Sequence, residues 1–159
     1  MKVEDIYDQP GHMIRRAYQM VMAVFAEEAK GSGITPVQFS AMIVIREQPG
    51  VDATRVAELI YFDRATIGSV LDRLEKKGLV LRQTGKQDRR TKRLYITPRG
   101  QALLRKIERM SPRISARIIA PLAPADRARL MTMLNQLVDL DYAEARAPNG
   151  IYELRRRTK

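Results

Sequence analysis

Residues 52–78 read D-A-T-R-V-A-E-L-I-Y-F-D-R-A-T-I-G-S-V-L-D-R-L-E-K-K-G, and this stretch decides the fold. Asp52 and Asp63 are each followed by apolar residues at the spacings of three and four that are typical of an amphipathic helix. Because aspartate is a preferred N-cap, two short helices are predicted, and Gly78 suits the end of the second. Only about three or four residues separate the two helices, which is the spacing of a helix-turn-helix.

A basic hairpin is predicted directly after this pair of helices. Residues 79–81 and 94–96 are short apolar runs with the pattern of strands. Residues 85–100, G-K-Q-D-R-R-T-K-R-L-Y-I-T-P-R-G, contain six Lys or Arg and one acidic residue. The sequence therefore predicts a winged helix-turn-helix, with the cations gathered at the tip of the wing.

Amphipathic helices are predicted on both sides of this lobe. One covers residues 12–30, and a second begins at T-P-V-Q, residues 35–38, which combines an N-cap, a first-turn proline and a capping-box glutamine. Residues 97–98, T-P, repeat the cap-then-proline signal, and the Ser-Pro pair at 111–112 is expected to kink or restart the helix that follows. A last helix begins at Pro124, with an apolar side made of Leu130, Met133, Leu134, Leu137 and Leu140.

The predicted fold class is mainly α (α+β), a winged helix-turn-helix whose N- and C-terminal helices form a dimerisation region. The small lobe cannot cover all the apolar faces of those helices, and pairing with a second copy under twofold symmetry would bury them. Such a dimer places two recognition helices roughly 34 Å apart, one turn of DNA. The expected domains are an N-terminal dimerisation helix, the DNA-binding lobe, the C-terminal dimerisation helices and a basic, flexible tail, at residues 1–33, 34–99, 100–143 and 144–159 respectively.

The positive charge is concentrated in the middle of the chain. The 159 residues carry a formal net charge of +11, with a pI near 10.3. Residues 64–99 contain eleven Lys or Arg against three Asp or Glu, a net charge of +8. A charge this far from zero favours an anionic partner, which nucleic acid, a membrane surface or an acidic protein could provide.

Several function classes find no support in the sequence. There are no cysteines, which excludes disulfides, thiolate zinc sites and cysteine-based redox sensing, and the one histidine, His12, cannot build a metal site alone. No apolar run approaches the roughly 20 residues that span a bilayer, and the N-terminus is too acidic and polar for a signal peptide. With no nucleophile–His–acid set and no Walker loop, we expect a cytoplasmic non-enzyme with no cofactor, metal or membrane partner.

Candidate DNA contacts lie on the second helix of the pair and on the wing. The residues of that helix outside its apolar stripe are small or cationic, which suits a major groove. They are Arg64, Ala65, Thr66, Ser69 and Arg73. The wing cations would reach the neighbouring minor groove and its phosphates, and these are Lys86, Arg89, Arg90, Lys92 and Arg93. Asp88 either forms the turn or holds an arginine fork through a bidentate pair.

Three motifs resemble those of MarR-type transcriptional regulators. They are D-R-R followed by I-T-P-R-G (88–90 and 96–100), L-D-R-L-E-K-K-G-L-V (71–80) and V-A-E-L-I-Y-F-D-R-A-T-I-G-S-V (56–70), within residues 12–142. The resemblance implies a homodimer that binds a pseudo-palindromic operator in double-stranded DNA. It also implies that Arg90 is the minor-groove arginine with Asp88 as its partner, and that the recognition positions are Arg64, Thr66, Ser69 and Arg73.

The same resemblance implies a small-molecule pocket between the dimerisation helices and the winged lobe. Residues 7–18, Y-D-Q-P-G-H-M-I-R-R-A-Y, are similar to the first helix of MarR-type regulators of aromatic-acid catabolism, some of which sense a CoA thioester. His12, Arg15 and Arg16 could receive a carboxylate, in an aromatic slot lined by Tyr18, Phe39 and Met42. The alternatives are a surface or capping role for His12 and solvated arginines, while Met20, Met22, Met42, Met131 and Met133 fit an adaptable core.

Two functions are compatible with these features. The first is a ligand-responsive transcriptional regulator that acts as a repressor. An aromatic carboxylate or aromatic acyl-CoA would release it from its operator by binding preferentially to one of two conformations of the protein. The second is a non-specific or architectural protein of double-stranded DNA. Selection from random duplexes separates them, because only the first yields a consensus sequence.

Overall fold

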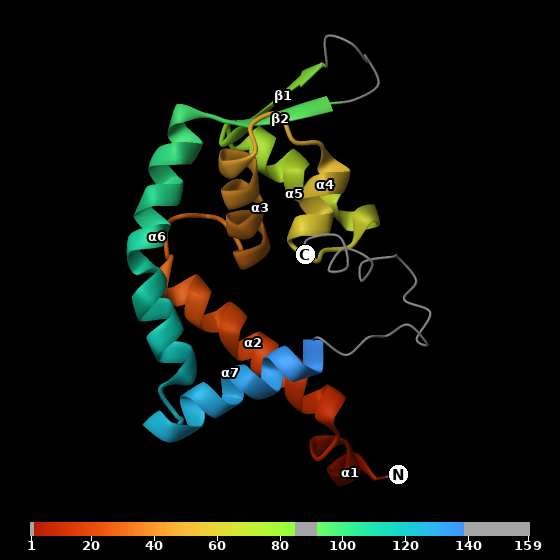
Figure 1. Cartoon of the computed structure of the whole chain (residues 1–159), viewed down its shortest axis with the longest axis vertical. Helices are drawn as coiled ribbons and strands as arrows, with labels where there is room; N and C mark the ends of the chain where they lie inside the picture. Colours follow the sequence, from red (N-terminus) through yellow and green to blue (C-terminus); the bar gives the residue numbers. More distant parts are fainter. Residues whose placement is uncertain (1, 85–91, 139–159) are drawn as a thin grey trace.

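The molecule has a lobe at one end, a stem at the other and a long helix that joins them. The structure is a computed structural model that describes residues 2–84 and 92–138. The lobe contains α3 (Pro36–Glu47), α4 (Ala53–Leu59), α5 (Arg64–Lys76), β1 (Val80–Thr84) and β2 (Lys92–Ile96). The stem contains α1 (Val3–Tyr7), α2 (Pro10–Glu28) and α7 (Pro124–Val138), and α6 (Pro98–Ile119) runs along the side of both (Figure 1). The predicted fold class, mainly helical with a winged helix-turn-helix, is confirmed.

Each helix of the lobe begins at the N-cap that the sequence predicts. Thr35 Oγ1 accepts from the Gln38 amide, and the Gln38 side chain accepts from the Thr35 amide, which completes the capping box of α3. Asp52 and Asp63 each accept from an amide in the first turn of α4 and α5, at 2.9 and 3.0 Å. These bonds satisfy amide groups that have no partner within the helix. Gly78, at φ +66°, follows the end of α5 in the left-handed region that favours glycine.

The core lies inside the lobe and extends along the inner face of α6. Fully buried side chains come from every element of the lobe and from α6: Met42, Ile45, Val56, Leu71, Leu74, Val80, Leu94, Leu104 and Ile107. In α5 the buried positions are the four that the helical spacing predicts, Ile67, Val70, Leu71 and Leu74. Because this stripe faces the core, the opposite side of α5 is left to solvent.

The wing is a two-stranded antiparallel sheet in which β1 pairs along its full length with β2. Its root is fastened by the segment between α3 and α4, where Val51 forms a bridge with Leu94. The Gly50 amide donates to the Leu94 carbonyl at 2.8 Å, and the Leu94 amide donates to the Val51 carbonyl at 2.9 Å. The wing therefore has a fixed base on the lobe, a contact that the sequence pattern did not predict.

One continuous helix, α6, connects the wing to the stem. Thr97 caps it, and Gly100 fits so closely against the hairpin that an added Cβ would lie 2.1 Å from the Leu79 carbonyl oxygen. Of the two outcomes expected at residues 111–112, a restart is wrong, because α6 continues through Pro112 and curves along the molecule (Figure 1). Proline removes one amide donor from the helix. Ile107 and Ile114, one on each side of Pro112, are buried and hold α6 to the neighbouring elements.

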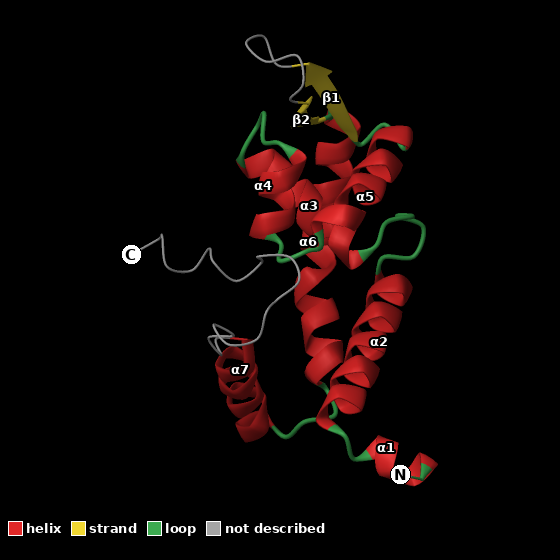
Figure 2. Ribbon diagram, turned by 90° about the vertical axis from the view of Figure 1, so that its right-hand side faces the viewer, coloured by secondary structure: helices red, strands yellow, loops and turns green. Residues whose placement is uncertain are grey.

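The stem packs less tightly than the lobe. α2 buries only Val24 and Phe25, near its junction with the lobe, and α7 buries no residue. Figure 2 shows α7 standing apart from α2 and α6, although its ribbon crosses α2 in Figure 1. Large apolar side chains on these two helices are exposed instead: Met13, Ile14, Tyr18, Met20, Met131, Met133, Leu134, Leu137 and Val138.

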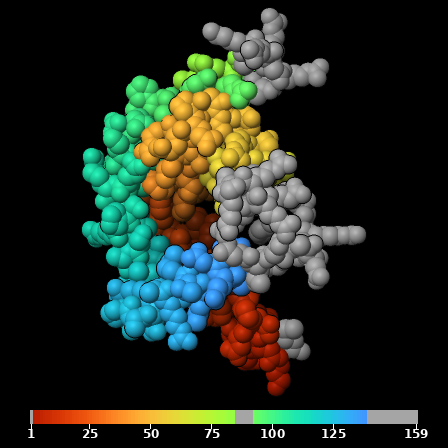
Figure 3. Space-filling model, viewed as in Figure 1, coloured from red at the N-terminus to blue at the C-terminus, as the bar shows by residue number. Residues whose placement is uncertain are grey.

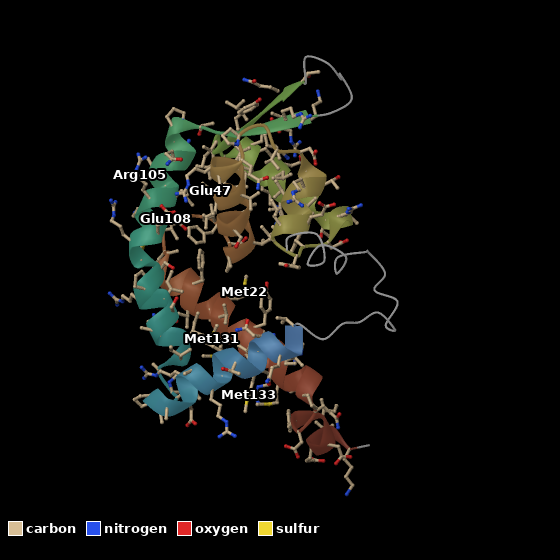
Figure 4. All side chains as sticks on the ribbon, in the orientation of Figure 1. Met22, Glu47, Arg105, Glu108, Met131 and Met133 are labelled. Atoms are coloured by element: carbon tan, nitrogen blue, oxygen red, sulfur yellow. The ribbon has the colours of Figure 1, made fainter. Side chains whose placement is uncertain are left out.

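The structure differs from the sequence expectations at α1 and at the methionines. The short helix α1 was not predicted, and it forms the end of the molecule below α7 in Figure 3. Of the methionines expected in an adaptable core, only Met42 is fully buried. Met22 on α2 is half-buried, and Met20 is exposed. Met131 and Met133 on α7, which Figure 4 labels, are exposed as well. Leu140, expected on the last helix, lies outside the described residues.

Candidate nucleic-acid interface

α5 exposes to solvent all the residues that are predicted to enter a major groove. Arg64, Thr66, Ser69 and Arg73 are all exposed, whereas Ile67 between them is buried. Thr66, Ser69 and Arg73 lie three and four residues apart, so they follow one line along the helix. The first half of this line is small, which permits the close approach that a recognition helix needs in a major groove.

Glu58 of α4 holds two arginines at the junction of α4 and α5. Its carboxylate contacts Arg64 at 2.5 Å and Arg55 at 3.4 Å, and its side chain is 21% exposed. The Arg64 guanidinium is thereby held beside the first turn of α5, where it can exchange the carboxylate for a phosphate or a base edge. Sequence reasoning missed Glu58, although its i, i+3 spacing from Arg55 was an available signal.

Both hydroxyl groups on this face are hydrogen-bonded within the protein. Thr66 donates to the Asp63 carboxylate at 2.9 Å, and Ser69 donates to the Thr66 carbonyl at 2.9 Å. The hydrogen bond from the Ala65 amide, followed by that from the Thr66 hydroxyl, lowers the pKa of Asp63 below its ordinary value. Asp63 is therefore ionised at neutral pH, and its carboxylate both caps α5 and orients the Thr66 side chain.

Ion pairs attach the wing to α5. Arg82 of β1 contacts Asp72 at 2.6 Å and Glu75 at 3.3 Å. Within the described residues, the exposed cations Arg73 and Lys76 on α5 form no ion pair of their own. Arg82 offsets one of the two negative charges of Asp72 and Glu75, and Arg73 and Lys76 add two positive charges, so this part of α5 carries a net positive charge.

Two of the predicted wing cations, Lys92 and Arg93, belong to the described residues. Both are exposed on β2. The Lys92 ammonium donates to Thr84 Oγ1 at 3.2 Å, and the Arg93 guanidinium donates to the Gly50 carbonyl at 3.2 Å. Among the residues that the structure describes, these neutral acceptors leave both positive charges without a carboxylate partner, toward the tip end of the paired strands. The other predicted residues of the hairpin tip lie outside the described residues: Lys86, Asp88, Arg89 and Arg90.

Ion pairs also connect α6 to the lobe and to the stem. Arg46 of α3 contacts Glu108 of α6 at 2.6 Å, and this hydrogen bond raises the pKa of Arg46 above its usual value. Figure 4 shows Arg105 on the outer side of α6, away from this contact. On the stem side, Glu28 of α2 is 7% exposed and contacts Arg113 and Arg117 at 2.9 and 2.7 Å. The middle of α6 is thus tied to the lobe through Glu108, and its second half is tied to α2 through Arg113 and Arg117.

The residues predicted to bind a ligand form two separate groups within one chain. His12 meets Tyr7 edge to face with ring centroids 5.5 Å apart, and its Nε2 is buried with no hydrogen-bond partner among the described atoms. Arg15, Arg16 and Tyr18 follow on exposed turns of α2.

The second group, Phe39 and Met42, lies in the lobe. Phe39 packs against Phe25 with ring centroids 6.0 Å apart, and Met42 is fully buried in the core. His12 lies about 20 Å from Phe25 along α2 at 1.5 Å per residue. The structure therefore does not bring His12 and Phe39 together within a single chain.

The described residues show neither a metal cluster nor a membrane span. In residues 2–84 and 92–138, no group of three His, Cys, Asp or Glu side chains is placed to hold a metal ion. Over the same residues, no helix combines the length and the hydrophobicity that crossing a bilayer requires.

These observations define the class as a winged helix-turn-helix protein with an exposed, cationic second helix beside a basic wing. The family model described as MarR family matches residues 34–92, from just before α3 to the start of β2. The chain is 33% identical over 132 residues to the putative transcriptional regulatory protein for the hcr operon of Thauera aromatica, covering 82% of this chain and 80% of that protein. It is 28% identical over 137 residues to the HTH-type transcriptional repressor NicR of Pseudomonas putida, covering 86% and 87%.

Solved structures share the fold along most of the chain. BpsR of Bordetella bronchiseptica, solved to explain how 6-hydroxynicotinic acid regulates its DNA binding, is 30% identical with a TM-score of 0.75, covering 84% of this chain and 96% of that one. The transcriptional repressor CouR, bound to a 23-mer DNA duplex, is 27% identical with a TM-score of 0.74, covering 87% and 98%. The chain belongs to the MarR family of transcriptional regulators.

Proposed function

We propose that this chain is a repressor that binds a pseudo-palindromic operator in double-stranded DNA as a homodimer. The observation that carries the proposal is the exposed line of Thr66, Ser69 and Arg73 on α5, with a buried opposite face and with exposed Arg64 at the first residue of the helix. CouR, with a TM-score of 0.74 to this chain, was solved on duplex DNA, and NicR is named a repressor. Residues 34–99 would form the DNA-binding lobe of each subunit.

The exposed apolar side chains of α2 and α7 support the homodimer. Single apolar residues on a surface are ordinary, but α2 and α7 each expose several large apolar side chains, and such groups of them are typical of an interaction surface. A second copy related by twofold symmetry would cover residues of both helices and set two α5 helices in successive major grooves. The segments outside the lobe, 1–33 and 100–143, would form the dimerisation region, with 144–159 as a basic tail.

We further propose that a small aromatic acid or its CoA thioester releases the repressor. The DNA binding of BpsR is regulated by 6-hydroxynicotinic acid, an aromatic carboxylate. In this chain, Arg15 and Arg16 are exposed cations on α2 beside His12 and Tyr18. Because Phe39 is distant from His12 along one chain, a pocket that uses both would need the second copy, and Met42, which is fully buried, could line it only behind Phe39.

Selection from random duplexes tests DNA recognition. The full chain should enrich an inverted repeat whose binding weakens steeply as salt is raised. Arg73→Ala should reduce affinity for the selected duplex by about tenfold or more if it contacts a base edge, whereas Arg105→Ala, an equal loss of charge on the outer side of α6, should have little effect. Enrichment of no sequence over random duplex would contradict a repressor and leave the architectural alternative.

Thermal shifts test the effector. 6-Hydroxynicotinic acid, benzoic acid and benzoyl-CoA should be compared, and a true effector should both raise the Tm and lower operator affinity, because it binds one of two states preferentially. Arg16→Ala should abolish the shift, and Arg105→Ala should preserve it. A shift that survives in Arg16→Ala would remove Arg16 from the proposed pocket.

A further inference from the structure

The hydroxyl groups of Thr66 and Ser69 are constrained in a way that bears on which bases they can read. A hydroxyl has one proton to donate and two lone pairs that accept. Thr66 Oγ1 lies 2.9 Å from Asp63 Oδ2 and 3.3 Å from the Asp63 carbonyl, and Ser69 Oγ lies 2.9 Å from the Thr66 carbonyl. A carboxylate and a carbonyl have no proton to give, so in each pair the hydroxyl must be the donor.

Both protons are therefore turned into the protein, and only lone pairs are available on the outward side. Turning the Thr66 proton toward DNA would break a hydrogen bond to an ionised carboxylate, which is stronger than a bond between neutral groups. Turning the Ser69 proton outward would give up its bond to the helix carbonyl. An unconstrained serine or threonine accepts or donates equally well in a major groove, but these two are set to accept.

The donors in a major groove are the exocyclic amines, N6 of adenine and N4 of cytosine, whereas guanine and thymine present acceptors at the corresponding position. We infer that Thr66 and Ser69 select adenine or cytosine over guanine or thymine at the bases they face. Arg64 and Arg73, which only donate, complement them by suiting the acceptor atoms of guanine. This inference rests on the proposed binding of an operator and adds the chemistry by which two positions of α5 would read it.

Base analogues that lack a single amine test the inference. In the duplex that the full wild-type chain selects, each adenine is replaced in turn by purine, and each cytosine by 2-pyrimidinone. At one or more positions in each half-site, loss of the amine should weaken wild-type binding by about 3- to 10-fold, the usual range for one hydrogen bond. The same replacement should weaken binding less in Thr66→Val or, at a second position, in Ser69→Ala, because only the lost Watson–Crick hydrogen bond of the amine then remains. Ser115→Ala, an exposed serine on α6, should respond as wild type does.

The outcomes separate this inference from the proposed function. If a consensus is selected but every amine that matters to wild type matters equally to Thr66→Val and Ser69→Ala, the inference is wrong and operator binding stands. The inference also fails if the two variants lose sensitivity to removal of guanine N7 instead, because the hydroxyls would then be donors. If no consensus is selected, both proposals fail. Circular dichroism confirms folding, and Thr66→Ala serves as a second variant at the same exposed site.

Discussion

Asp63 has two roles at the start of α5. One carboxylate oxygen accepts from the Ala65 amide, and the other accepts from the Thr66 hydroxyl. The sequence predicts the first role, because an aspartate that precedes an apolar repeat is a helix-start signal. It could not predict the second, since the direction of a threonine side chain depends on its rotamer. The contact between Glu58 and Arg64 was missed for a related reason, because it crosses a turn whose angle is set by the packing of the whole lobe.

The pH dependence of stability tests the ionised state of Asp63. Its pKa is lowered in the fold, first by the Ala65 amide and then by Thr66, so its contribution is complete above the unfolded value of about 3.9. That contribution is lost as the pH falls through the lower folded pKa. Asp63→Asn retains an N-cap but cannot ionise, so its free energy of unfolding should fall less steeply than that of wild type below about pH 4.

Urea unfolding at one protein concentration, at neutral pH and at several lower values, measures this difference. Asp126→Asn, which removes an exposed carboxylate from α7, is the matched control and should follow the wild-type curve in shape. Parallel curves for wild type and Asp63→Asn would show that hydrogen bonds from Ala65 and Thr66 do not stabilise the carboxylate.

At the scale of the element, α6 depends on one glycine at its first turn. Gly100 is buried, and its amide donates to Thr97 Oγ1 at 3.0 Å. An added Cβ would lie 2.1 Å from the Leu79 carbonyl oxygen and 2.9 Å from Ile96 Cγ1. The motif I-T-P-R-G that resembled a regulator family thus has a physical basis, because the threonine caps α6 while the glycine lets the helix pack directly on the root of the wing.

Two glycine substitutions of opposite sign test this packing. Gly100→Ala should lower the free energy of unfolding by about 1–3 kcal/mol, because backbone must move to admit the methyl group. Gly68→Ala, within α5, meets nothing within 4 Å and should raise it by about 0.5–1 kcal/mol, since alanine costs less entropy in a helix. Urea denaturation of both variants gives the comparison. A Gly100→Ala variant as stable as wild type would contradict the tight contact.

Element types were largely predictable, and the exceptions have local causes. Caps at Thr35, Asp52, Asp63 and Thr97 carry strong start signals, and the structure uses all four. Of the kink or restart expected at Pro112, the restart is wrong, because tertiary packing on both sides outweighs the loss of one hydrogen bond within the helix. The bridge at Val51 was not foreseeable, since one residue in a loop has no strand pattern.

At the scale of the whole molecule, burial is divided unequally between lobe and stem. The sequence predicted wide apolar faces on the outer helices, and it predicted that the lobe would not cover them. It could not predict which residues stay exposed, because that depends on where α6 leaves α2. In the structure α2 packs on α6 over its last turns and is open along its first ones, while α7 is open along its whole length.

A charge placed on the open face of α7 tests whether that face pairs with a second copy. Leu134 is 40% exposed in the single chain, so a partner that covers it would bury that share of a leucine, about 0.6–1.2 kcal/mol on each subunit. Leu134→Asp removes that contribution and buries a carboxylate, so the dimer should dissociate at concentrations at least about 10- to 100-fold higher than for wild type. Gln136→Asp adds the same charge at a polar, exposed position of α7 and should leave the dimer nearly unchanged.

Sedimentation velocity across a dilution series distinguishes these outcomes. Operator affinity of Leu134→Asp should fall in parallel, because a single α5 reads only one half-site. A wild-type chain that sediments as a monomer throughout, or a Leu134→Asp variant that remains dimeric, would show that α7 is covered in some other way.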